Sequence, residues 1–94
     1  MDTRYYKKID GSMFDFRNFY FSIALKLPDN AVIAEVGVAN GKSALYLAGA
    51  LTELEKPFTM YLIDNMDYGA NDQLTTIINN VVESGLKGIR ILPV

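Results

Sequence analysis

Hydrophobic residues recur along this chain with two different periods, and the changes of period divide it into predicted helices and strands. From residue 12 to residue 27, apolar side chains follow the three- and four-residue spacing of a helix. Ser12, with Asp15 three places later, fits a capping box at the start of that helix, and Pro28 ends it. Its apolar stripe consists of Phe16, Phe19, Tyr20, Ile23 and Leu27. The polar residues 1–11 are predicted to form an arm.

Two further amphipathic segments follow, and each is bounded by residues that end helices. Residues 41–55 place apolar side chains on one helical face, and Pro57 stops the pattern. Residues 72–84 give the cleanest stripe in the chain, and Gly85 fits the left-handed position that follows many helices. The first stripe consists of Ala44, Leu47, Ala48, Leu51 and Leu54, and the second of Leu74, Ile77, Ile78, Val81 and Val82.

Three short apolar runs between these segments are predicted to be strands. They cover residues 31–38, 58–64 and 88–94. The first is expected to be buried on both faces, as strands of parallel sheets usually are. A helix followed by β-α-β-α-β predicts an α/β domain whose three-stranded parallel sheet is joined by right-handed crossovers. The expected fold is Rossmann-like and three-layered, with strand order 3-2-1 and all carboxyl ends at one crevice.

The amino-acid composition excludes several kinds of binding and catalytic site. Ninety-four residues suffice for one small domain, and a formal net charge of −2 does not favour binding to nucleic acid. The chain has no cysteine and no histidine, which excludes disulfides, thiolate metal sites and catalysis by its own imidazole groups. No segment has the length of apolar sequence that a membrane span needs, and a cytoplasmic location is expected.

A glycine loop, within the stretch AEVGVANGKSA, follows the first predicted strand and opens the next helix. Three residues separate Gly37 from Gly41, whereas a phosphate-binding P-loop has four before its Gly-Lys pair. A P-loop therefore fits poorly, and Lys42 is expected to be a solvated residue of the first helical turn. A dinucleotide fingerprint also fits poorly, because Ala39 stands where the middle glycine would approach a pyrophosphate.

The same stretch resembles the donor-binding region of the class I S-adenosylmethionine-dependent methyltransferases. The similarity lies in EVGVANG, residues 35–41, and in KSALYLA after it, and it is greatest to small-molecule O-methyltransferases and related bacterial or phage members. In that family the glycine loop packs against the methionine part of the donor. The resemblance implies that Gly37, Val38 and Gly41 line the donor, and that Glu35 orients the loop or the donor's ammonium group.

A second match stands at the end of the second predicted strand, where MYLID closes on Asp64, 23 positions after Gly41. An acidic side chain there can accept hydrogen bonds from both ribose hydroxyls of an adenosine, and the family has an acidic residue at that place. Asn65 and Met66 would then lie beside the adenine. The resemblance thus implies S-adenosyl-L-methionine as cofactor and a transferase activity on an acceptor, expected to be a small molecule.

The resemblance covers residues 12–94, which correspond to the first half of the family's domain. Catalytic residues would lie beyond Val94, so the sequence assigns none, and this chain alone is expected to be inactive. Asp64 and Asp67 offer too few oxygen ligands for a metal site. The alternative is a non-catalytic module that acts in assembly with an empty loop. In both cases the first strand is predicted to be an open hydrophobic sheet edge, which favours self-association or pairing with a complementary chain.

Overall fold

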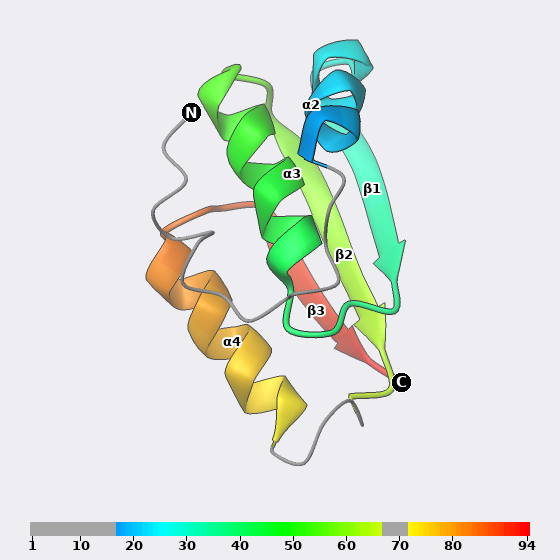
Figure 1. The fold of residues 1–94 in the computed structure, drawn as a ribbon, viewed down its shortest axis with the longest axis vertical. Helices are drawn as coiled ribbons and strands as arrows, with labels where there is room; N and C mark the ends of the chain where they lie inside the picture. Colours follow the sequence, from blue (N-terminus) through cyan, green and yellow to red (C-terminus); the bar gives the residue numbers. More distant parts are fainter. Residues whose placement is uncertain (1–16, 67–71) are drawn as a thin grey trace.

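The computed structural model describes residues 17–66 and 72–94, in which helices and strands alternate along the chain (Figure 1). The elements are α2 (Arg17–Lys26), β1 (Ala31–Val36), α3 (Lys42–Glu53), β2 (Phe58–Asp64), α4 (Gln73–Ser84) and β3 (Ile89–Pro93). This is the predicted order, and β2 has its predicted bounds. The predicted arm and the capping residues Ser12 and Asp15 lie outside the described residues.

The three strands form one parallel sheet in the order β1-β2-β3. Ala31 aligns with Phe58 at the start of the first pairing, and Met60 aligns with Ile89 at the start of the second. Parallel strands joined through helices bring all their carboxyl ends to one edge of the sheet. The predicted α/β class and parallel three-stranded sheet are therefore confirmed, and β1 is an edge strand of the sheet.

Helix α4 begins and ends at residues that satisfy its terminal backbone groups. The Asp72 side chain accepts a hydrogen bond from the Thr75 N–H at 3.1 Å, which is the usual role of an N-cap residue. Gly85 follows the helix at φ 70°, a left-handed conformation that glycine adopts at little cost. The predicted C-cap is thus confirmed. The predicted apolar stripe is only partly covered, because Ile77 is fully buried whereas Val82 is 72% exposed.

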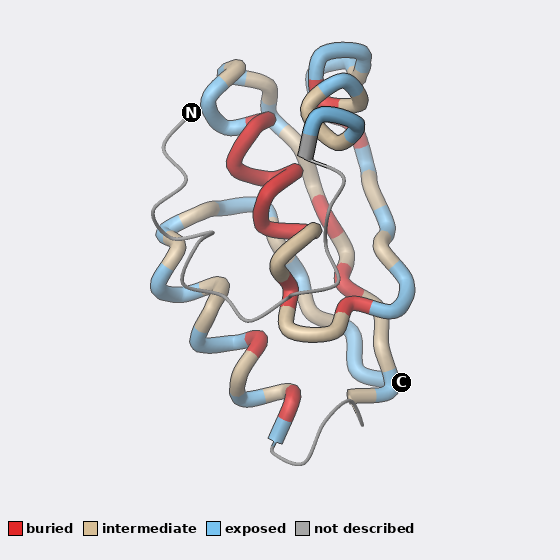
Figure 2. Tube along the Cα trace, in the orientation of Figure 1, coloured by how far each residue is buried: buried red, intermediate tan, exposed pale blue. Residues whose placement is uncertain are grey.

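The core lies between the sheet and α3, which is buried along most of its length (Figure 2). The sheet covers one side of α3, and α2 packs against another. The largest fully buried apolar side chains are Leu45 and Leu51 of α3, Met60 and Leu62 of β2, and Ile77 of α4. Burial of one side chain of this size contributes about 1.5–3 kcal/mol to stability. Helix α3 and strand β2 therefore form the centre of the domain.

The described helices all cover the same face of the sheet (Figure 1), and none of them lies over the opposite face, which we call the bare face. Alternate residues of β1 reach the bare face, where Val32 is 74% exposed and Val36 is 76% exposed. The prediction that this strand is buried on both faces is therefore wrong for the described residues, because no described helix lies over its second face. The described residues build two layers, and the third layer expected from the sequence is not among them.

Lys56 fastens α2 to the start of β2. Its ammonium group donates hydrogen bonds to the carbonyl oxygens of Ala24 at 3.0 Å, Leu25 at 2.7 Å and Leu27 at 2.8 Å. The first two carbonyls belong to the last turn of α2 and the third follows the helix directly. Helices leave carbonyl groups without partners at this end and carry a partial negative charge there. A single cation thus satisfies the end of α2 and fixes this helix beside the sheet.

The described helices are short. Helix α2 has 10 residues, and α3 and α4 have 12 each. A membrane-spanning helix needs about 20 apolar residues. Within residues 17–66 and 72–94, no helix has the length and the apolar character that crossing a membrane requires.

Candidate functional site

The glycine loop between β1 and α3 turns sharply at the carboxyl edge of the sheet. Gly37, Ala39 and Gly41 have positive φ angles of 80°, 51° and 89°. The two glycines adopt this conformation readily, and Ala39 adopts it despite its side chain. The Gly41 N–H donates a hydrogen bond to the Val38 carbonyl at 2.9 Å, and Gly41 is the N-cap residue of α3. The loop therefore reverses the chain within five residues and leads directly into the helix.

Asp64, the last residue of β2, ties this loop to the neighbouring strand. One carboxylate oxygen accepts the Val38 N–H at 2.6 Å, and the other accepts the Met66 N–H at 2.9 Å. The Gly37 N–H also donates to the Ile63 carbonyl at 3.0 Å, so the pairing of β1 with β2 continues into the loop. The fold thus brings together the two features that the sequence marks separately, the glycine loop and the acidic end of the second strand.

The pKa of the Asp64 carboxyl lies below its ordinary value. Desolvation on its own would raise this pKa, but hydrogen bonds to the ionised form outweigh it. The donors are the backbone N–H groups of Met66, Val38 and Ala39 and the side chain of Gln73. The Val38 and Met66 bonds place one backbone N–H on each carboxylate oxygen. Asp64 is therefore ionised at neutral pH, and its charge is held beside the loop.

Helix α4 holds the carbonyl groups of the loop through two side-chain amides. Gln73 Nε2 donates to the Ala39 carbonyl at 2.7 Å, and Asn80 Nδ2 donates to the Asn40 carbonyl at 2.9 Å. Gln73 and Asn80 lie seven positions apart, on the helix face that also carries the buried Ile77. Neither amide was predicted as a site residue from the sequence. The sequence gives only a weak signal, because both lie beside Ile77 at the border of the apolar stripe.

Glu35 lies on the covered face of the sheet and joins β1 to the first turn of α3. Its Oε1 accepts a hydrogen bond from Ser43 Oγ at 2.6 Å. Burial raises the pKa of Glu35, and the Ser43 hydrogen bond opposes that effect. Burial and then the Glu35 charge raise the pKa of Tyr20 on α2, which a hydrogen bond with Ser43 partly offsets. The contact with Ser43 is what a residue that orients the loop would make.

The other residues marked by the sequence lie around the loop in different environments. Gly37 is exposed, and a Cβ added there would meet no atom within 4 Å, so the space beside it is open. Val38 is 2% exposed and its side chain belongs to the core. Asn65 is exposed, whereas Met66 is half-buried and packs against the core. Lys42 is also half-buried, in the first turn of α3.

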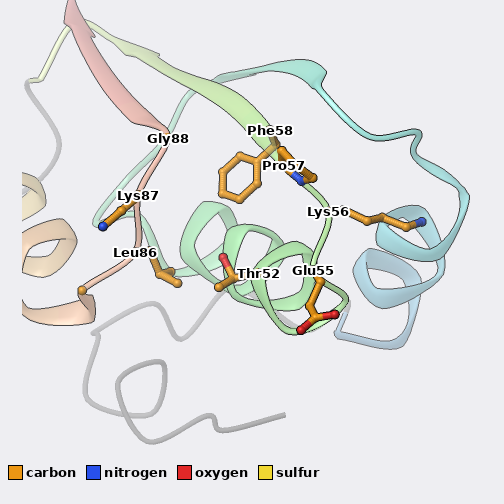
Figure 3. Close-up of a pocket in the computed structure, with 9 residues that line it drawn as sticks. Thr52, Glu55, Lys56, Pro57, Phe58, Leu86, Lys87 and Gly88 are labelled. Carbon is orange, nitrogen blue, oxygen red and sulfur yellow. The ribbon is translucent and has the colours of Figure 1, made fainter.

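A pocket of about 510 Å³ lies at the opposite, amino edge of the sheet (Figure 3). The end of α3, the start of β2 and the segment before β3 line it, with Thr52, Phe58 and Leu86 in its wall. Lys56 extends away from it towards α2. None of the residues that the sequence marks for ligand binding lines this pocket. It is therefore separate from the glycine loop and Asp64.

The donor groups of the described residues suit hydrogen bonding better than metal binding. Among residues 17–66 and 72–94, no group of three or more acidic, histidine or cysteine side chains is placed to hold a metal ion. Asp67 lies outside these residues. Every buried side-chain nitrogen or oxygen in the same ranges has a hydrogen-bond partner. The arrangement offers an ionised carboxylate beside a tight loop that opens a helix.

Neither a scan against protein-family models nor a search of curated proteins gives a match for this chain. Its function therefore has to be argued from the loop, Asp64 and the residues that hold them.

Proposed function

We propose that this chain binds S-adenosyl-L-methionine and forms the donor-binding part of a class I methyltransferase. The observation that carries the proposal is the hydrogen bond between the Val38 N–H and the Asp64 carboxylate. It joins a glycine loop to the acidic end of the next strand, at the carboxyl edge of a parallel sheet, where such sheets bind ligands. A Rossmann-like fold with strand order 3-2-1 is part of the same proposal.

The proposed contacts divide between the ends of β1 and β2. Asp64 accepts hydrogen bonds from the ribose hydroxyls, and Asn65 and Met66 flank the adenine. Gly37 and Gly41 line the methionine part of the donor, and the open space beside Gly37 supports this assignment. The bound donor would supply an activated methyl group, so the chain itself needs only to bind and orient it.

The charges around the loop also support a cationic ligand. Asp64 is ionised at neutral pH, and Glu35 places a second carboxyl group behind the loop, oriented by Ser43. Opposite charges a few ångströms apart attract by several kcal/mol at the effective dielectric of a protein surface. We propose a small molecule as the methyl acceptor. A cytoplasmic location belongs to the same proposal, because the chain has no cysteine that would form disulfides in an oxidising compartment.

One observation favours a second candidate, a non-catalytic module that acts in assembly. Both oxygens of Asp64 already accept hydrogen bonds from the protein itself, so ribose hydroxyls would compete with the Val38 and Met66 N–H groups. An Asp64 that serves only to shape the loop would need no ligand. The exposed valines of β1 would then be the functional surface.

We further propose that the open edge at β1 pairs with β1 of a second copy of this chain. An edge strand presents unpaired backbone groups, and this one also exposes Val32 and Val36. Light scattering on concentrated protein should show a dimer, which Val36→Lys should dissociate. Val82→Lys is the matched control, because Val82 is equally exposed but lies on α4. A monomeric wild type, or a Val36→Lys dimer, would contradict edge pairing, and capture of a different chain would favour a complementary partner.

Calorimetric titration with S-adenosylhomocysteine tests the proposed ligand site directly. ATP and NAD serve as control ligands, and Asp64→Asn is the main variant because it keeps the shape of the side chain and removes its charge. We expect micromolar binding of S-adenosylhomocysteine alone, weakened about tenfold or more in Asp64→Asn. Asp72→Asn is the control, since Asp72 is an exposed carboxyl group that caps α4.

The outcomes separate the two candidates. Binding that depends on Asp64 and not on Asp72 supports the donor site. A folded wild type that binds none of the three ligands would overturn the donor site and favour the assembly role. Binding of ATP or NAD with equal affinity would instead indicate a general nucleotide site.

A further inference from the structure

Three consecutive residues of the glycine loop are held by side chains from outside the loop. Asp64 of β2 accepts the Val38 N–H, and Gln73 and Asn80 of α4 donate to the carbonyl groups of the next two residues. The loop is thus clamped on its amide side by a strand and on its carbonyl side by a helix. The loop therefore keeps its shape only while β2 and α4 keep their positions relative to each other.

Gln73 is the side chain that contacts both sides of the clamp. Its amide nitrogen donates to the Ala39 carbonyl at 2.7 Å, and its side chain also hydrogen-bonds the Asp64 carboxylate. A side-chain amide carries two N–H groups, which is enough for both oxygens. Gln73 is 2% exposed, so water cannot readily take its place if the amide is removed.

We propose that Gln73 is a positioning residue for the candidate site, which holds the glycine loop and the Asp64 carboxylate in one geometry and makes the loop follow any shift of α4. This deepens the proposed function and rests on it only for the identity of the ligand. Without the amide, Ala39 would lose a contact that holds it in a left-handed conformation, which an alanine does not favour. The loop would then relax, and the bond from the Val38 N–H to Asp64 would open more often.

Substitutions at Gln73 separate the hydrogen bonds from the volume of the side chain. Gln73→Met keeps the length and removes both donors. Gln73→Glu keeps the shape and places a carboxyl group against the Ala39 carbonyl and Asp64. Asn79→Ala is the matched control, because Asn79 is an exposed amide on the same helix. Each variant is checked for an intact core through the exchange of the Leu62 N–H, which lies in the central strand.

Hydrogen exchange of the Val38 N–H in the unliganded protein is the first measurement. We expect its protection factor to fall about tenfold in Gln73→Met and to stay unchanged in Asn79→Ala, because one net hydrogen bond to a charged or buried group is worth about tenfold in an equilibrium. The affinity for S-adenosylhomocysteine should fall by a similar factor. A purely space-filling role for Gln73 would leave the Val38 protection in Gln73→Met unchanged.

The pH dependence of Gln73→Glu gives a readout that loss of packing would not reproduce. Burial beside the ionised Asp64 raises the pKa of the new carboxyl group above its ordinary range. The profile is therefore taken from about pH 8, where the ionised form repels both oxygens and lowers the Val38 protection factor, to about pH 5, where the protonated form donates again and restores part of the protection. Asp64 and Asp72 have lowered pKa values and Glu35 has a raised one, so the wild type is measured at both pH values as a reference.

The positioning role of Gln73 and the proposed donor site can be contradicted separately. A Val38 protection factor that is unchanged in Gln73→Met, or equally low at both pH values in Gln73→Glu, would overturn the positioning role. A wild type that shows the expected exchange but no binding of S-adenosylhomocysteine would leave Gln73 as the positioning residue of the loop and overturn the proposed donor site.

Discussion

The two faces of the sheet are built by the same three strands, yet one face is the core and the other is bare. On β2, Met60 and Leu62 point towards the helices and are fully buried. On β1, Val32 and Val36 point the other way and are about three-quarters exposed. All four side chains are apolar, so residue type does not distinguish the faces. The position of the helices does.

The bare face is continuous across the sheet. Val36 aligns with Ile63, and Ile63 aligns with Leu92, so apolar side chains of all three strands lie in one row. Parallel sheets usually have both faces covered, and contiguous exposed apolar patches mark interaction sites. The comparison teaches that, among the described residues, the covered face carries the stability, while the bare face exposes apolar side chains that contribute little to it.

The largest expected effect is a difference in the free energy of unfolding between a substitution on the covered face and one on the bare face. Leu62→Ala should lower the free energy of unfolding by about 3 kcal/mol, because it leaves a cavity in the core. In dilute, monomeric protein Val36→Ala should change it by less than about 0.5 kcal/mol, since the side chain is exposed in the single chain. Chemical denaturation measures both, and Leu62→Val gives a milder core variant if the alanine variant does not fold. Equal losses at the two positions would mean that the bare face is covered in solution.

A smaller effect is expected where α2 is fixed over the covered face. Lys56→Met should lower the free energy of unfolding by about 1–2 kcal/mol, because three carbonyl groups at the end of α2 lose a charged donor. Exchange of the Leu27 N–H, which bonds the Ile23 carbonyl, reports whether the helix end frays. Lys26→Met is the control, since Lys26 is exposed in the last turn of the same helix. An equal loss from Lys26→Met would show that overall charge, rather than the contact, is responsible.

The smallest effect concerns the carboxyl group that β1 places on the covered face. Burial raises the pKa of Glu35 above 4.5, so the folded chain holds this proton more tightly than the unfolded chain. The resulting stability is complete below the ordinary pKa and is lost as the pH rises through the raised one. Glu35→Gln keeps an acceptor for Ser43 and removes the charge. It should raise Tm by a few degrees at pH 7 and leave it unchanged near pH 3.5.

Thermal unfolding at the two pH values checks this prediction. Glu53→Gln is the control, because Glu53 is exposed on α3. A gain of equal size at both pH values would show that the amide improves packing and that the charge has no part in the effect.

Sequence alone best predicts the helices and strands whose ends are marked by residues with special backbone properties, such as glycine and proline. Gly85 provides the left-handed residue that ends α4, and the structure shows it at that position. Strand β2 starts just after Pro57 and ends at Asp64, as predicted. In each case the signal acts within a few residues, so the rest of the fold does not need to be known.

Burial is predicted less well, because a stripe marks a face but not how much of that face a neighbour covers. Ile78 and Val82 belong to the predicted stripe of α4 but are 42% and 72% exposed. The prediction that β1 is buried on both faces failed for the same reason, because an apolar strand does not show whether helices cover its second face. The positions of the glycine loop and Asp64 at one sheet edge were predictable, since parallel strands align their carboxyl ends. The roles of Gln73 and Asn80 were not predictable, because their hydrogen bonds to the loop span 34 and 40 positions of the sequence.

The loop at residues 37–41 depends on partners that are synthesised after it. Its bond to Asp64 spans 26 positions, and those to Gln73 and Asn80 span 34 and 40. At about 5–20 residues per second, a ribosome adds Asn80 at least about two seconds after the loop residue that it holds. Contacts this distant in sequence form slowly and late in folding. A peptide ending at Ser43 would therefore contain the whole loop and lack Asp64, Gln73 and Asn80, the three side chains that hold it from outside.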